Sequence, residues 1–140
     1  MATKIFLDTN IIIDVLDNKR PAHQWAFELF KQIEAGAAEA FISETVITTT
    51  DYLLQKILTK VRRVELLTAL LETITILPLS NSICHKALQS NFNDLEDALL
   101  YQLAFENGMN YFVTNDTAAI KKLSTSLLPV ISSKNLLQHL

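Results

Sequence analysis

Short apolar runs alternate along the chain with longer stretches in which apolar residues recur every three or four positions. Runs of the first kind are typical of buried strands, and they lie at 4–7, 39–43, 73–79, 110–114 and 127–131. The helical spacing predicts helices at 11–16, 21–35, 45–58, 60–72, 80–90, 95–107 and 117–123, and a short closing helix at the end of the chain.

This alternation of strand and helix is typical of a parallel sheet covered by helices on both faces. We therefore predict an α/β fold with a central parallel sheet of about five strands. No linker, repeat or low-complexity segment interrupts the pattern, so residues 1–140 are expected to form a single domain.

Composition narrows the class of protein. Hydrophobic residues make up 49% of the chain and charged residues 19%, which is enough apolar sequence for a sizeable core. Cys84 is the single cysteine, so no intramolecular disulfide can form and a reducing compartment is expected. No signal-peptide pattern and no run of roughly 20 apolar residues is present. We expect a cytoplasmic protein with no membrane partner.

The acidic residues suggest chemistry. Asp8 follows the first predicted strand, Asp116 follows the fourth, and Asp94 and Asp97 lie at the start of the 95–107 helix. In open α/β sheets, ligands bind beyond the carboxyl ends of the strands. Carboxylates that converge there repel one another unless a hard cation lies between them, and Mg²⁺ binds in this way. Such a site can activate water for phosphodiester cleavage, so the net charge of −3 does not exclude a nucleic-acid substrate.

Each of these acids also has a purely structural interpretation. Asp8, Asp94 and Asp116 all precede helical patterns and could be N-caps, with Asp97 completing a capping-box-like pair after Asp94. Asn10 is a further plausible N-cap for the 11–16 helix. The hypothesis of a metal site therefore depends on the whole set. Three other acids are expected on solvated helix faces, namely Asp14, Asp17 and Glu106.

Three segments together carry a family resemblance: FLDTNIIIDVL (6–16), FNDLEDALLYQLAFENG (92–108) and NYFVTND (110–116). They occur in the same order and chain length as in the PIN-domain nucleases, and the chain resembles the VapC-like toxins of type II toxin–antitoxin systems in particular. The resemblance covers essentially the whole chain. It implies a three-layer α/β/α sandwich and cleavage of single-stranded RNA that depends on Mg²⁺ or Mn²⁺.

By motif, the resemblance assigns metal binding and catalysis to Asp8, Asp97 and Asp116, and it implies supporting roles for Asn10 and Thr114. Asp94, one helical turn before Asp97, is included as a further metal-binding candidate. The family usually has an acid about six residues after the serine that follows strand 2. Here that serine is Ser43 and the position is Thr49.

Two acids lie near Thr49, but neither is expected to replace the missing one. Asp51 is two residues too late and is rotated by roughly 200° on a helix, so it should point away from Asp8. Glu44 could reach the site only if its loop folded inward. We expect Thr49 to support the site through a water molecule.

Other residues are candidates for binding partners. Lys121 and Lys122 follow the Asp116 loop and are expected to hold the phosphate backbone of RNA. The cluster of Lys60, Arg62 and Arg63 is predicted to be a solvated helix face rather than an RNA contact. Cys84 and His85 favour ordinary packing over a zinc site. The family resemblance implies a homodimer through Tyr52, Leu53 and the 61–71 helix, and a small antitoxin that binds the acidic cleft.

The leading hypothesis is a metal-dependent endoribonuclease, the toxin of a toxin–antitoxin pair. The alternative is a catalytically weak or silent PIN-like module that binds RNA or a protein, and Thr49 favours it. A phosphatase with Asp8 as nucleophile is a third hypothesis, but such enzymes generally need a second Asp where this chain has Asn10.

Overall fold

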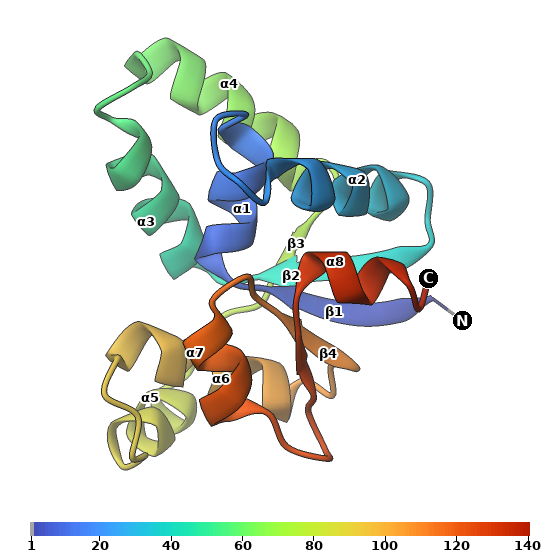
Figure 1. Ribbon diagram of the computed structural model, residues 1–140. Helices are drawn as coiled ribbons and strands as arrows, with labels where there is room; N and C mark the ends of the chain where they lie inside the picture. The colour runs from blue at the N-terminus through green and yellow to red at the C-terminus, as the bar shows by residue number, and fades with distance from the viewer. Residues whose placement is uncertain (1) are drawn as a thin grey trace.

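The computed structural model describes residues 2–140 and shows a central sheet with helices on both faces (Figure 1). The elements along the chain are β1 (Thr3–Leu7), α1 (Thr9–Leu16), α2 (His23–Glu34), β2 (Ala38–Ile42), α3 (Glu44–Leu54), α4 (Lys60–Leu71), β3 (Thr75–Ile76), α5 (Asn81–Leu88), α6 (Leu95–Glu106), β4 (Tyr111–Val113), α7 (Thr117–Leu123), β5 (Val130–Ile131) and α8 (Ser133–Leu137). No helix among them is long and apolar enough to cross a membrane.

All five strands are parallel, in the order β3-β2-β1-β4-β5. The chain builds outward from β1 through β2 to β3, and then returns to place β4 on the other side of β1. The strand order therefore reverses between β1 and β4, where Ile5 lies opposite Tyr111 and Leu7 opposite Val113. Such a switch point is where open α/β sheets leave a crevice for a ligand.

The layers agree with the predicted three-layer sandwich. Figure 1 shows α1, α2 and α8 on one face of the sheet and α5, α6 and α7 on the other, while α3 and α4 extend beyond it as a pair. Phe6 and Phe112 stack between the neighbouring strands β1 and β4 with ring centroids 5.7 Å apart. Both are fully buried, as are Leu29 of α2 and Leu100 of α6 on the covering helices. Burial from both sides explains why the central strands read as continuous apolar runs.

Several predicted boundaries differ from the structure. Helix α1 begins at Thr9 and its N-cap is Asp8, so the assignment of Asn10 as N-cap is wrong. Helix α3 ends at Leu54, four residues earlier than predicted. The outer strands β3 and β5 have two residues each, because each pairs along one side only, at the edge of the sheet. Ile74 and Val130 in these runs belong to the core, but Thr75 and Ile76 of β3 are exposed. The 73–79 run was therefore wrong in strand length and, in part, in burial.

Candidate active site

Asp8 connects the end of β1 to the start of α1. Its backbone is extended, and its carboxylate accepts a hydrogen bond from the backbone N–H of Thr9 at 2.8 Å, so it is the N-cap of α1. The other carboxylate oxygen accepts from Asn10 Nδ2 at 3.0 Å and from Thr114 Oγ1 at 2.8 Å. Only 6% of Asp8 is exposed to solvent. The Asp8 side chain can therefore cap α1 and at the same time line the crevice between β1 and β4.

Asn10 and Thr114 join the ends of β1 and β4. Asn10 Nδ2 also donates to Thr114 Oγ1 at 2.9 Å, and Asn10 Oδ1 accepts from the backbone N–H of Asn115 at 3.0 Å. Thr114 Oγ1 accepts a further hydrogen bond from the backbone N–H of Asp116 at 3.1 Å. The structure thus brings both residues to Asp8, where the sequence analysis expected supporting residues, and it fixes the orientation of the Asp8 carboxylate.

Asp97 and Asp116 reach the same crevice from two other helices. Asp97 lies in the first turn of α6, and Asp116 caps α7 by accepting from the backbone N–H of Ala118 at 2.9 Å. Together with Asp8 they line a cleft of about 260 Å³, which is also bordered by Asp94 and Thr49. Segments that are far apart in the sequence therefore meet where the strand order reverses.

Burial, and to a smaller extent nearby negative charge, raises the pKa of two carboxyl groups in this cleft. Burial, and then the negative charges of Asp8, Asp94 and Asp116, raise the pKa of Asp97 to about 7. Burial also raises the pKa of Asp8, against the opposing effect of its hydrogen bonds from Thr114 and Thr9. Raised pKa values at converging carboxyl groups mark a site where negative charge is poorly compensated.

The donor set fits a hard divalent cation in chemical type. Carboxylate oxygens are the ligands preferred by Mg²⁺ and Mn²⁺, and a cation would offset the burial and the neighbouring negative charges that raise the pKa of Asp97. Across residues 2–140, no three His, Cys, Asp or Glu side chains lie close enough to enclose a metal ion by themselves. Mg²⁺ usually keeps several water molecules and needs only one or two direct carboxylates, so a site without three direct protein ligands is compatible with it.

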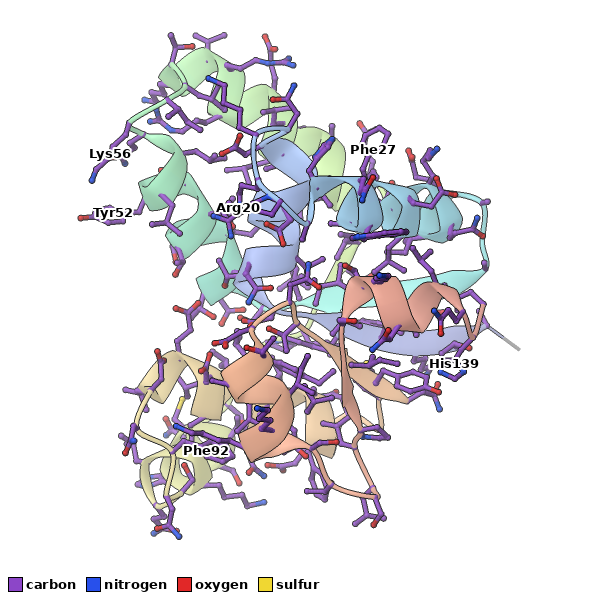
Figure 2. All side chains as sticks on the ribbon, in the orientation of Figure 1. Arg20, Phe27, Tyr52, Lys56, Phe92 and His139 are labelled. Carbon is purple, nitrogen blue, oxygen red and sulfur yellow. The ribbon has the colours of Figure 1, made fainter. Side chains whose placement is uncertain are left out.

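A second cavity continues the cleft on the far side of Asp97 and Asp116. It has a volume of about 470 Å³ and extends from these two acids to Phe92 and Lys122. Figure 2 shows Phe92 beside the α5–α6 end of the molecule. Lys122 therefore lies on the wall, as expected for a residue near the site, while Lys121 is exposed on α7 and does not line this cavity.

The expected departure at helix α3 is visible in the structure. Thr49 faces the cleft that contains Asp8. Asp51 turns away, and its carboxylate accepts from Arg63 Nε of α4 at 2.8 Å. Glu44 accepts from the backbone N–H of Leu79 at 3.5 Å. Among the described residues of α3, no acid thus lines the cleft beside Thr49.

One acid was placed wrongly by the sequence analysis. Asp14 is not on a solvated face, because its side chain is only 3% exposed. Its carboxylate accepts hydrogen bonds from Arg20 Nε at 2.5 Å and from Asn115 Nδ2 at 2.8 Å. By contrast, Glu106 lies on the exposed face of α6, where it pairs with Lys86 at 3.2 Å. The apolar neighbours of Asp14 in IIIDVL are the signal that could have predicted its burial.

Two further charged residues of the cleft were missed. Glu96 of α6 lines it and accepts from Thr9 Oγ1 at 2.9 Å. Arg20 lines it from the loop between α1 and α2. Glu96 stands directly before Asp97, so it could have been proposed from its position, whereas no sequence pattern indicates Arg20. In the other basic cluster, Arg62 is exposed and pairs with Glu65 of its own helix, as predicted. Arg63 is only 13% exposed and pairs with Asp51 of α3, so the prediction of a solvated face is wrong for this residue.

Comparisons with known proteins agree with this geometry. The family model described as PIN domain matches residues 4–118. Ribonuclease VapC1 from Aquifex aeolicus (strain VF5) is 30% identical over an alignment of 118 residues, and the match covers 81% of each chain.

Solved structures share the fold at low sequence identity. VapBC2 from Rickettsia felis, bound to a promoter DNA fragment, has a TM-score of 0.70 at 17% identity and covers 93% of this chain and 98% of its own. DNA-bound VapBC from Salmonella typhimurium has a TM-score of 0.69 at 17% identity, with 94% and 98% covered. VapC20 from Mycobacterium tuberculosis, a sarcin–ricin loop cleaving toxin, has a TM-score of 0.65 at 16% identity, with 82% and 93% covered.

Proposed function

This chain belongs to the PIN domain family, and on that premise we propose that it is a metal-dependent endoribonuclease that acts as the toxin of a toxin–antitoxin pair. One observation carries the proposal: Asp8, Asp97 and Asp116 come from three separate segments and line one cleft at the switch point of the sheet. The ribonuclease relative supports the reaction class.

In this proposal Asp8, Asp97 and Asp116 would hold Mg²⁺ or Mn²⁺ together with the water molecules that the ion keeps, and Asp94 would add negative charge at the rim. When bound, such a cation lowers the pKa of a coordinated water and stabilises charge on the phosphoryl oxygens. Thr114 and Asn10 keep the Asp8 carboxylate in one orientation through their hydrogen bonds. Thr49 contributes a hydroxyl to the wall of the cleft.

The substrate is proposed to be RNA, held along the cleft. Lys122 on the wall of the second cavity and Lys121 beside it on α7 would bind backbone phosphates on the far side of Asp116. The acidic cleft alone would repel RNA, so both the cation and these lysines are needed for binding.

Two protein partners are proposed. The VapBC structures pair toxins of this fold with antitoxins, which supports a small antitoxin for this chain as well. A homodimer is proposed through the α3–α4 surface, defined here as Tyr52, Leu53, Val61, Val64 and Leu71, all of which are exposed. Because its RNA substrates would be in the cytoplasm, we propose that the protein acts there.

A silent PIN-like module is the second candidate, and Thr49 is the observation that favours it. One carboxylate fewer in the cleft weakens the attraction for a cation. An Mn²⁺ titration separates the two candidates: the nuclease binds Mn²⁺ in a way that depends on Asp8, whereas a silent module binds it weakly or not at all.

The decisive test of activity is cleavage of a mixed single-stranded RNA pool in Mg²⁺, Mn²⁺ or EDTA, with wild type beside Asp8→Asn. Asn is as good an N-cap as Asp, so this variant removes the charge and keeps the cap of α1. Asp17→Asn, at the other end of α1, is the matched control. We expect metal-dependent cleavage that falls by at least about 100-fold in Asp8→Asn alone. A folded wild type that cuts under no metal would favour the silent module.

A further inference from the structure

We propose that Arg20 binds a phosphate of the RNA substrate inside the acidic cleft, an inference that rests on the nuclease function proposed above. Arg20 belongs to the loop that joins α1 to α2, and Figure 2 shows it between α1 and α3. It lines the same cleft as Asp8 and Asp97. Among the described residues on that wall it is the one cation.

The buried carboxylate of Asp14 anchors Arg20. Arg20 Nε donates to Asp14 Oδ1 at 2.5 Å, while the second oxygen of Asp14 accepts from Asn115 Nδ2 at 2.8 Å. Asn115 is itself fixed, because its Oδ1 accepts from the backbone N–H of Ser133 at 3.0 Å and from Ser133 Oγ at 2.9 Å. This chain of contacts runs from the core to the guanidinium and limits the positions that the group can take.

The anchor uses only one of the five N–H groups of Arg20. Within residues 2–140, neither terminal nitrogen of its guanidinium donates a hydrogen bond, and 41% of the side chain remains exposed. A charged group with free donors in a fixed plane matches the oxygens of a phosphate, which arginine binds in a bidentate way. A cation needed only to neutralise Asp14 would not have to face the cleft.

The distribution of charge also favours this role. Five carboxylates line the cleft, those of Asp8, Asp94, Glu96, Asp97 and Asp116. Arg20 lies on the wall of this cleft, and Lys122 lies on the wall of the adjoining cavity. A polyanion that passes the acids would therefore meet one cation in each cavity. Arg20 would hold the phosphate on the α1 side of the scissile bond and Lys122 the backbone on the α7 side.

Binding and its salt dependence test the proposal. Single-stranded RNA is titrated in Mg²⁺ at several salt concentrations, with all variants made in an Asp97→Asn background that blocks cleavage. The logarithm of the binding constant falls as the logarithm of the salt concentration rises, and each phosphate contact to single-stranded RNA adds about −0.7 to that slope. We therefore expect the slope for Arg20→Gln to be less negative than that of the parent by about 0.7. Lys19→Gln removes the same charge from the neighbouring exposed position, which does not line the cleft, and should leave the slope unchanged.

Cleavage kinetics in the otherwise wild-type protein add a second readout. We expect Arg20→Gln to lower kcat/KM by about tenfold or more, and Arg20→Lys to keep the salt slope while recovering only part of kcat/KM, because lysine cannot pair with Asp14 and a phosphate through one planar group. Thermal unfolding of each variant confirms that it is folded.

The possible failures are distinguishable. If Arg20→Gln lowers the melting temperature but leaves the salt slope and kcat/KM at wild-type values, Arg20 is only the ion-pair partner of Asp14 and the inference is wrong, although the nuclease function stands. If the wild type itself neither binds nor cuts RNA, the proposed function fails before any variant is compared.

Discussion

Asp97 links the charge of the cleft to the stability of the protein. Its pKa is raised from an ordinary value of 3.8 to about 7, so the folded state binds this proton more tightly than the unfolded chain does. The resulting stabilisation is complete below about pH 4 and is lost as the pH rises through about 7. In EDTA we therefore expect the wild type to lose stability between pH 5 and pH 8. After allowance for solvent around a half-exposed carboxyl, the loss is roughly 1–2 kcal/mol.

Asp97→Asn isolates this contribution from other groups that titrate in the same range. The difference in melting temperature between wild type and Asp97→Asn, measured by scanning calorimetry in EDTA, should grow by roughly 3–8 °C from pH 5 to pH 8 in favour of the variant. Saturating Mn²⁺ at pH 8 should reduce that difference. A difference in melting temperature that does not change with pH would show that the pKa of Asp97 is not raised in the folded protein.

The sequence predicted single residues well where position along a strand decided the outcome. Asp8 and Asp116 each follow a strand, and parallel strands bring such positions to one edge. Asp14 was misplaced because helical spacing alone does not distinguish a buried acid from a solvated one, and the apolar residues around it in IIIDVL were the one available signal. Arg20 could not be predicted, since its position depends on how a loop folds back onto α1.

At the scale of one element, helix α6 depends on its first turn. Asp94 is its N-cap and accepts from the backbone N–H of Asp97 at 3.1 Å. Removal of a cap by alanine costs about 1 kcal/mol, while asparagine preserves it. We expect Asp94→Ala to lower the denaturant midpoint accordingly and Asp94→Asn to stay within a few tenths of a kcal/mol of wild type.

The same pair of variants decides whether Asp94 also contributes to metal binding. If its role is capping alone, Asp94→Asn should bind Mn²⁺ as tightly as wild type, and Asp94→Ala should bind less tightly because Asp97 sits on a frayed turn. A loss of Mn²⁺ affinity in Asp94→Asn, with stability unchanged, would instead place its charge in the metal site.

The sequence predicted whether each segment is a helix or a strand better than it predicted the length of that segment. Apolar runs marked the central strands because these are buried on both faces, yet the edge strand β3 has two residues, both exposed, where a buried strand of seven was expected. Its length depends on pairing with Phe41 and Ile42 of β2, which no local pattern encodes. The caps at Asp94 and Asp116, in contrast, are local hydrogen bonds, and the sequence predicted both.

At the scale of the whole molecule, the site exists because the strand order reverses. Alternation of strand and helix predicted a parallel sheet, but not that β4 would lie next to β1. The family resemblance assigned Asp8, Asp97 and Asp116 to one site but gave no strand order. The structure shows how such distant positions meet: residues more than 100 positions apart, such as Asp8 and Thr114, form a hydrogen bond of 2.8 Å.

The α3–α4 surface gives the last prediction, which concerns assembly. Val61 is 70% exposed on α4, and Figure 2 shows Tyr52 of α3 pointing away from the body of the protein. Contiguous exposed apolar residues of this kind commonly mark a protein interface. We expect light scattering to give twice the chain mass of 15.8 kDa for the wild type and a single chain mass for Val61→Asp.

Leu127→Asp is the matched control, because Leu127 is 76% exposed and lies after α7, away from this surface. It introduces the same charge at a similar exposure, so it should leave the dimer intact. If Val61→Asp remains a dimer, copies of the chain associate through another face. If the wild type is a monomer, the exposed side chains of α3 and α4 are left for a different protein, and the proposed antitoxin is then the partner to test on that surface.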